Sequence, residues 1–160
     1  MTELETFYTD LDQKCNELSL QNIGRLQCKK GCCSCCVDDI TVFEIEAENI
    51  KTKYSQFLKT EYPHQAGACA FLDNTGACRI YDARPYVCRT QGLPLRWIEE
   101  NTEYRDICPL NELENEPVTG IEENKCFHSE PYEIRLALMQ IKHDHGAMKR
   151  IALRSLFEKP

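Results

Sequence analysis

The stretch CKKGCCSCC, residues 28–36, carries five of the chain's eleven cysteines within nine positions. Four of them follow the spacing C-x3-C-x2-C-C, which lets a tight loop direct several sulfur atoms at one centre. Soft thiolates bind zinc, copper(I) or iron–sulfur clusters in preference to hard ions. This run therefore predicts a metal site, and it restricts the local backbone more than any other feature of the sequence.

The meaning of these cysteines depends on their redox compartment. The first twenty residues carry acids where a secretory signal needs a basic region followed by an apolar run. No stretch approaches the roughly 18 apolar residues of a membrane span. We therefore expect a cytoplasmic protein without membrane association, in which thiols stay reduced and serve metal binding or chemistry. The odd cysteine count also leaves at least one thiol outside any all-disulfide scheme.

The formal charge of −7 argues against broad nucleic-acid binding. The acidity is local, because residues 99–130 hold ten acids and two bases. Two interpretations of this segment remain open: a solvated surface loop, or a docking surface for a basic protein partner.

Amphipathic helical patterns frame the cysteines. We expect an N-terminal helix within residues 1–26, which begins with a capping box of Thr2 and Glu5 and buries Cys15. A second helix is expected after Thr41, where Glu44 repeats the capping-box spacing.

A third helix is expected over residues 129–158, with a kink or a break at Gly146. The apolar face predicted for it carries Ile134, Leu138, Ile141, His145, Met148, Ala152 and Leu156.

Between the second and third helices, residues 69–72 and 77–81 have the pattern of two short strands joined by a turn. Such a hairpin would bring Cys69 and Cys78 close together. We therefore predict a single domain over residues 1–160, mainly α with a small β-hairpin, whose helices pack around a metal-stapled loop region. Its parts are the N-terminal helix 1–26, a cysteine-cluster module 28–108, an acidic loop 109–128 and the C-terminal helix 129–158.

Eight cysteines are candidate metal ligands: Cys28, Cys32, Cys35, Cys36, Cys69, Cys78, Cys88 and Cys108. The last four have the spacing C-x8-C-x9-C-x19-C, which lacks the paired C-x2-C knuckles of a zinc ribbon. This irregular spacing favours an iron–sulfur cluster, and zinc remains the alternative. Whether Cys33, Cys126 or His128 also contributes is left open.

The segments CKKGCCSCC and CAFLDNTGACRIYDARPYVCR resemble the YkgJ-type cysteine-cluster proteins, which carry a zinc- or iron-chelating CxxCxxCC domain. The resemblance covers about residues 28–108 and is most specific around Arg84, Pro85, Cys88 and Arg89. It implies metal binding through eight cysteines and a small, mostly helical domain. The same region also resembles the cysteine-rich part of flagellin lysine methylases.

Four thiolates around zinc or a [4Fe–4S] core in its 2+ state leave a formal charge of −2. Nearby arginines could offset this charge through charge-assisted hydrogen bonds, or they could instead pair with Asp82, Glu99 or Glu100 at the surface. The arginines in question are Arg79, Arg84, Arg89 and Arg96.

Three functions are compatible with these features. The favoured one is an intracellular metal-binding protein whose iron–sulfur cluster or zinc has a structural or redox role. The second is an enzyme of the protein-lysine-modifying type that uses the cluster. The sequence shows no nucleophile–base pair and no phosphate-binding glycine loop, which speaks against an enzyme. The third is an acidic partner-binding module with purely structural zinc.

Overall fold

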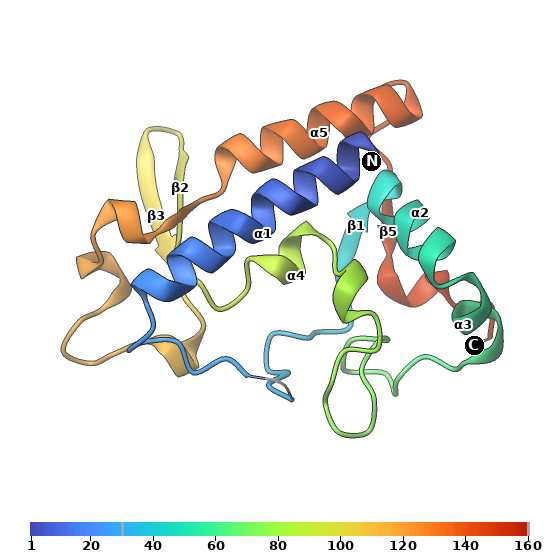
Figure 1. The fold of residues 1–160 in the computed structure, drawn as a ribbon, viewed down its shortest axis with the longest axis horizontal. Helices are drawn as coiled ribbons and strands as arrows, with labels where there is room; N and C mark the ends of the chain where they lie inside the picture. Colours follow the sequence, from blue (N-terminus) through green and yellow to red (C-terminus); the bar gives the residue numbers. More distant parts are fainter. Residues whose placement is uncertain (30, 160) are drawn as a thin grey trace. The chain divides into compact units, whose positions relative to one another are not determined.

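The structure is a computed structural model that describes residues 1–29 and 31–159 (Figure 1). The chain divides into two compact units, each built from two separate stretches of sequence. Unit 1 comprises Met1–Cys28 and Tyr86–Leu138, and unit 2 comprises Lys29–Pro85 and Met139–Pro160. No helix among the described residues is long and apolar enough to cross a membrane.

Unit 1 begins with helix α1 (Glu3–Gln21). The Thr2 hydroxyl accepts a hydrogen bond from the Glu5 N–H at 3.1 Å, and the Glu5 carboxylate accepts one from the Thr2 N–H at 2.9 Å. These two bonds form the predicted capping box. The prediction for this helix is confirmed, and its buried face consists of Leu4, Phe7, Tyr8, Leu11, Cys15 and Leu18.

The rest of unit 1 holds the short helix α4 (Tyr86–Arg89) and a three-stranded sheet. Strands β2 (Leu95–Glu99) and β3 (Thr102–Asp106) form an antiparallel hairpin, and β4 (Phe127–His128) runs parallel to β2. Helix α5 (Glu130–Asp144) begins in this unit and ends in unit 2. Short 3-10 turns lie at Pro109–Asn111, Val118–Gly120 and Glu123–Lys125.

Aromatic side chains form the centre of unit 1. The rings of Phe7 and Tyr132 are 6.2 Å apart between centroids, and those of Phe127 and Tyr132 are 4.9 Å apart. Tyr86, from α4, contacts both Phe7 and Phe127. Rings from three segments distant in sequence therefore fix α4, and with it Cys88, against α1.

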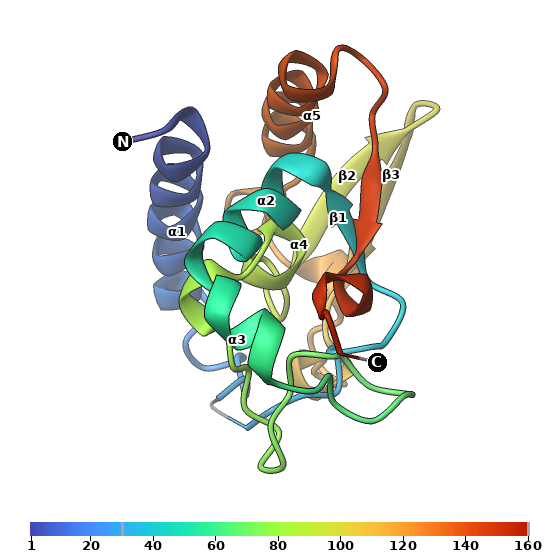
Figure 2. The same cartoon turned by 90° about the vertical axis from the view of Figure 1, so that its right-hand side faces the viewer.

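In unit 2, β1 (Thr41–Phe43) pairs antiparallel with β5 (Arg150–Ala152), and α2 (Glu44–Lys53) packs against β5 (Figure 2). Helix α3 (Ser55–Thr60) follows α2, and 3-10 turns lie at Tyr81–Ala83 and Leu153–Leu156. The core of this unit includes Val42, Ala47, Ile50, Leu58, Phe71, Ile80, Leu153, Leu156 and Phe157.

The predicted fold class is wrong. Within the described residues the chain has five α-helices and two small sheets, a mixed fold rather than a mainly α fold with one hairpin. The predicted hairpin is reduced to a single bridge between Leu72 and Cys78. The hairpin that does form lies at residues 95–106, where Glu100 and Asn101 adopt positive φ in a two-residue turn.

The second predicted helix begins later than expected, because Thr41–Phe43 forms a strand with β5 instead of a capping box. The N–H of Ile45, in the first turn of α2, donates instead to the side-chain oxygen of Gln140 at 3.0 Å. Tyr54, at the junction of α2 and α3, divides the expected helix into two.

The third predicted helix ends at Asp144 rather than near residue 158. His145 and Gly146 have φ of 55° and 90°, and the Gly146 N–H closes the helix on the Ile141 carbonyl at 3.0 Å. Within α5, Ile134, Leu138 and Ile141 of the predicted buried face are exposed, whereas Leu136 is buried. The buried side of α5 was therefore misidentified, and His145 is an exposed turn residue rather than a core residue.

Candidate metal centre

Two successive turns shape the cysteine run in unit 2. The Cys32 N–H donates to the Lys29 carbonyl and the Cys36 N–H donates to the Cys33 carbonyl, both at 2.9 Å. Each turn therefore ends on a cysteine. The Cys36 carbonyl in turn accepts a hydrogen bond from the Cys69 N–H at 2.9 Å, which joins the run to the segment that carries Cys69.

The segment from Cys69 to Cys78 folds back on itself through an Asx turn. The Asp73 carboxylate accepts hydrogen bonds from the N–H groups of Thr75 and Ala77 at 2.7 and 2.9 Å. Gly76, at φ 81°, follows within this turn, and a Cβ there would lie 3.2 Å from the Cys33 sulfur. The turn thus needs glycine where it approaches the cysteine run.

The thiol of Cys35 is made more acidic by the neighbouring cysteine. A hydrogen bond from the Cys36 side chain lowers the pKa of Cys35 to about 6, against the opposing effect of partial burial. A thiolate is the form of cysteine that binds metal. The adjacent pair therefore offers one anionic sulfur together with a second sulfur that stabilises its charge.

Cys69 and Cys78 lie close enough for their charges to interact. Burial raises the pKa of the Cys69 thiol, with Arg154 and Arg79 acting in the opposite direction. Burial also raises the pKa of Cys78, the charge of Cys69 raises it further, and Arg84 and Arg79 lower it. Buried thiols beside guanidinium groups suit a metal, which replaces their protons and neutralises part of their charge.

Arg79 and Arg154 also hold the backbone of this region. Arg79 donates to the Tyr62 and Ala70 carbonyls, both at 2.9 Å, and its guanidinium lies 4.8 Å from the centre of the Phe57 ring. Arg154 donates to the Ala68 carbonyl at 2.9 Å.

Arg154 further anchors the loop before Cys69 through His64 and Asp38. It donates to the His64 carbonyl at 2.7 Å and forms an ion pair with Asp38. The Asp38 carboxylate also accepts from the Gly67 N–H at 2.8 Å. Sequence reasoning missed Arg154, since it lies far from every cysteine in the chain.

Cys28 belongs to unit 1, and Asn111 holds it there. Asn111 is fully buried, and its side-chain amide lies 3.2 Å from the Cys28 sulfur and donates to the Gly92 carbonyl at 2.7 Å. Its side-chain oxygen accepts from the Gln27 N–H at 2.7 Å, and its own N–H donates to the Cys108 carbonyl at 2.8 Å. Asn111 thus ties together the backbone around Cys28, Gly92 and Cys108.

Gly92 lies directly against Cys28. It has φ of 92°, and a Cβ at this position would lie 2.6 Å from the Cys28 sulfur. Neither Asn111 nor Gly92 was singled out from the sequence, because nothing in their local pattern marks a thiol contact.

Two of the four arginines act on thiols, as one alternative expected: Arg79 and Arg84 lower the pKa of Cys78. The other two form ion pairs, but with acids other than Asp82, Glu99 or Glu100. Arg89 pairs with Asp12 at 2.6 Å, and Arg96 pairs with Glu103 at 2.8 Å.

Two further candidates belong to strand β4 and to the residue before it. Cys126 is buried, and its sulfur lies 3.8 Å from an Arg105 nitrogen. Burial raises the pKa of the Cys126 thiol. The His128 ring contacts the Glu123 carbonyl at 3.1 Å and an Arg96 nitrogen at 3.5 Å.

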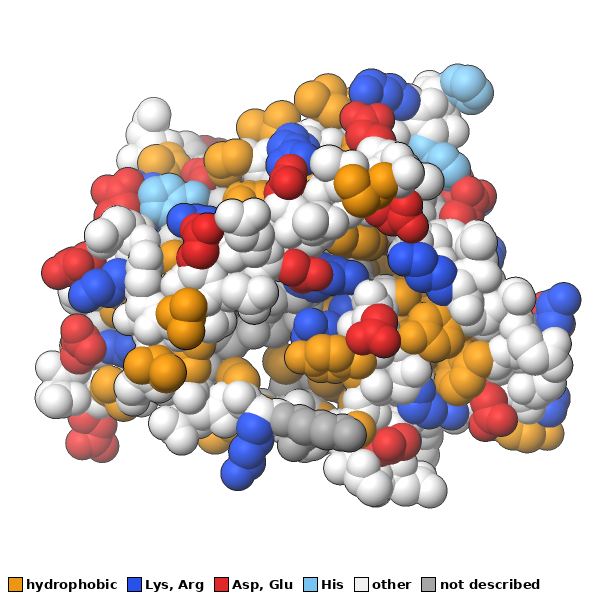
Figure 3. Space-filling model, in the orientation of Figure 1, with side chains coloured by type: hydrophobic (Ala, Val, Ile, Leu, Met, Phe, Trp, Pro, Cys, Tyr) orange, Lys and Arg blue, Asp and Glu red, His pale blue; other side chains and the backbone are white. Residues whose placement is uncertain are grey.

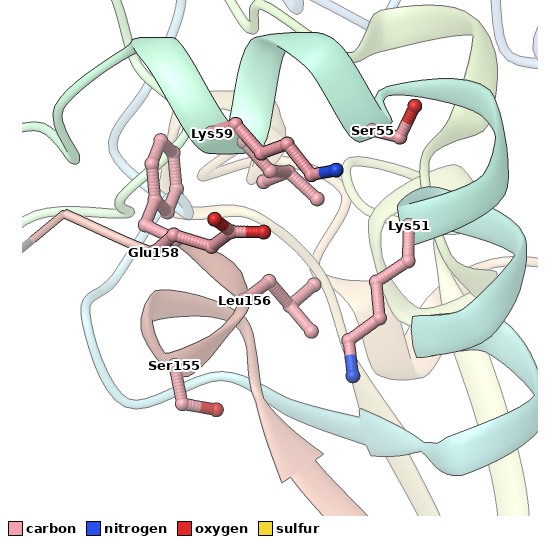
Figure 4. Close-up of a pocket in the computed structure, with 8 residues that line it drawn as sticks. Lys51, Ser55, Lys59, Ser155, Leu156 and Glu158 are labelled. Atoms are coloured by element: carbon pink, nitrogen blue, oxygen red, sulfur yellow. The ribbon is translucent and has the colours of Figure 1, made fainter.

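Across residues 1–29 and 31–159, no three His, Cys, Asp or Glu side chains converge as a ready-made metal site. Unit 2 contains five of the eight candidate cysteines: Cys32, Cys35, Cys36, Cys69 and Cys78. Unit 1 contains Cys28, Cys88 and Cys108. A cavity of about 380 Å³ in unit 2 is lined by two lysines, two serines, Glu158 and apolar residues and by no cysteine, so its chemistry does not match a thiolate site (Figure 4).

The donors in unit 2 nevertheless fit a thiophilic metal. They are all sulfur, they come from two loops joined by a backbone hydrogen bond, and guanidinium groups act on two of them. This arrangement defines a small protein of mixed fold with a thiol-rich centre suited to zinc or iron.

Residues 27–109 match the model of the CxxCxxCC family, described as "Putative zinc- or iron-chelating domain". This match spans just over half of the chain, and the chain belongs to that family. The predicted family is thereby confirmed, and a metal cofactor, zinc or iron, follows from it. No curated protein and no solved structure matches the chain.

Proposed function

We propose that this chain is an iron–sulfur protein whose cluster is held by cysteine thiolates, with zinc as the alternative metal. The observation that carries the proposal is the approach of two cysteine loops in unit 2, where the Cys69 N–H donates to the Cys36 carbonyl. Cys78 lies within electrostatic reach of Cys69, and Cys35 adjoins Cys36. These four cysteines are the part of the proposed ligand set that the geometry supports best.

The preference for iron over zinc comes from the ligands. All are sulfur, and the second group of cysteines lacks the knuckles from which zinc ribbons are built. The adjacent pair Cys35 and Cys36 adds to this argument, since a cluster with several metal atoms gives two neighbouring sulfurs more positions to bind than a single zinc ion does.

A structural role follows from how little regular structure surrounds the site. Residues 31–40 and 61–80 contain no helix or strand among those described, and they are held by turns and by Arg79 and Arg154. A metal that joins these loops would supply folding free energy that the small core of unit 2 lacks. A redox role would come in addition if the cluster is reducible.

Purification under anaerobic conditions, followed by a visible spectrum and analysis for iron, zinc and acid-labile sulfide, tests the metal's identity. We expect a brown, oxygen-sensitive protein that contains iron and sulfide. A colourless protein with stoichiometric zinc and no sulfide, made with iron available, would refute the cluster and leave structural zinc.

A further inference from the structure

The β2–β3 hairpin of unit 1 presents an aromatic pair on one face. The rings of Trp97 and Tyr104 are directly opposite in the register and stack at 5.6 Å between centroids, 15° from parallel. Tyr104 is 43% exposed and Trp97 is half-buried. Two large aromatic side chains in this state provide a flat, partly desolvated surface, which is the kind of surface that anchors partners.

Carboxylates flank this pair on the same face. Side chains two positions apart on a strand share a face, so Glu99 stands beyond Trp97 on β2 and Asp106 beyond Tyr104 on β3. Both are exposed. Among the described residues, Glu99 has no ion-pair partner, and Asp106 accepts only the N–H of its neighbour Ile107.

The opposite face of the hairpin is already occupied. There Glu103 is held between Arg96 and Arg105, with contacts of 2.9 and 2.6 Å, and Arg105 donates to the Ile121 carbonyl. This network fixes the hairpin to the 118–128 segment. The strand pair that carries Trp97 and Tyr104 is therefore held in place by contacts within unit 1.

The charge around the Trp97–Tyr104 face indicates what kind of partner would bind there. Residues 99–130 hold ten acids and two bases. Where Figure 1 places this stretch, Figure 3 shows acidic side chains with a few basic ones between them. Such a field attracts cations and repels phosphate groups. An aromatic face binds arginine or lysine through cation–π contacts, and adjacent carboxylates bind the same groups through ion pairs.

From this combination we infer that the face of Leu95, Trp97, Glu99, Thr102, Tyr104 and Asp106 is a docking surface for a basic segment of a partner protein. An arginine or lysine of that segment lies against the Trp97–Tyr104 pair, between the Glu99 and Asp106 carboxylates. The residues of this surface are not among the candidate metal ligands, and the inference does not depend on which metal the chain holds.

Trp97 is the chain's single tryptophan, so its fluorescence reports directly on this face. The full-length, anaerobically purified protein is titrated with a decapeptide of alternating arginine and serine, and Trp97 emission is followed together with the anisotropy of a fluorescein-labelled copy. We expect a saturable change that weakens as salt increases. A glutamate–serine decapeptide and a single-stranded DNA oligonucleotide should cause none.

Matched variants locate the binding site. Glu99→Gln with Asp106→Asn removes two charges, and the side-chain amide oxygen introduced by the second substitution can still accept from the Ile107 N–H. We expect the dissociation constant for the arginine peptide to rise about tenfold. The control variant, Glu114→Gln with Glu122→Gln, removes the same charge from the 109–128 loop. It should change the dissociation constant by less than about twofold. Circular dichroism establishes that each variant is folded.

Several results would overturn the inference. They are an absence of binding in the folded wild type, equal weakening by both double variants, or binding of DNA in place of the peptide. Sedimentation gives a further such result. If the wild type forms a dimer that the double substitution Glu99→Gln, Asp106→Asn dissociates, the surface is occupied by a second copy of the chain.

Discussion

Gly92→Ala isolates the contact between Gly92 and Cys28. The added Cβ would lie 2.6 Å from the Cys28 sulfur, on a residue with φ of 92°. Holding a non-glycine residue in left-handed backbone costs about 1–2 kcal/mol. Cys28 is exposed, so its thiol can rotate away from the added Cβ, but it then loses its 3.2 Å contact with the Asn111 amide, at a cost of about 1 kcal/mol. We therefore expect a loss of roughly 2–3 kcal/mol in the free energy of unfolding.

Urea denaturation followed by circular dichroism measures this loss, and two other glycines separate its causes. Gly67 has φ of 99° and open space around its Cβ position, so Gly67→Ala should show backbone strain alone, about 1–2 kcal/mol. Gly120 has neither the strain nor a neighbour, so Gly120→Ala should be close to neutral. The reasoning fails if Gly92→Ala is as stable as Gly120→Ala, or no less stable than Gly67→Ala.

Three further predictions concern the anchors and the ligands. Asn111→Ala leaves the Gln27 N–H and Gly92 carbonyl without their buried partner, and should lower the unfolding free energy by about 2–4 kcal/mol in the same urea assay. Arg154→Met should lower it by about 1–2 kcal/mol. The Gly67 N–H and, to a smaller extent, Arg154 lower the pKa of Asp38. A carboxyl group whose pKa is lowered by folding stabilises the folded state at neutral pH, and this stabilisation is lost as the group is protonated in acid. The variant should therefore lose less stability than the wild type as the pH falls through the Asp38 pKa, and an unchanged acid profile would contradict this. Cys35→Ser should reduce bound metal measured by elemental analysis, whereas Cys15→Ser should cost mainly packing energy, so equal metal loss in both would refute the division between ligand and core cysteines.

The local elements of the fold were the ones the sequence could predict. The α1 helix follows from a capping box and a regular apolar face, both of which lie within one segment. Strand β1 could not be predicted in this way, because Thr41–Phe43 becomes a strand only by pairing with residues 150–152 more than a hundred positions later. The end of α5 had a local signal in Gly146, but its buried side depends on tertiary contacts that no periodicity reveals.

The candidate metal centre likewise combines features that are local in the sequence with features that depend on the folded chain. The sequence identified the family, because a run of thiols at this spacing is typical of metal binding. It could not identify the residues that position them. Asn111 and Arg154 act through hydrogen bonds to backbone groups 84 to 90 positions away in sequence, and those contacts exist only in the folded chain.

The proposed role of the two cysteine loops of unit 2 is tested most directly by metal stoichiometry in paired samples. Iron, zinc and acid-labile sulfide per chain are measured for the anaerobically purified wild type and for the Cys69→Ser, Cys78→Ser double variant, with Cys15→Ser as the control. We predict stoichiometric iron and sulfide in the wild type and the control, and loss of both in the double variant. A wild type that holds no metal, or a double variant that keeps its full complement, would contradict the account.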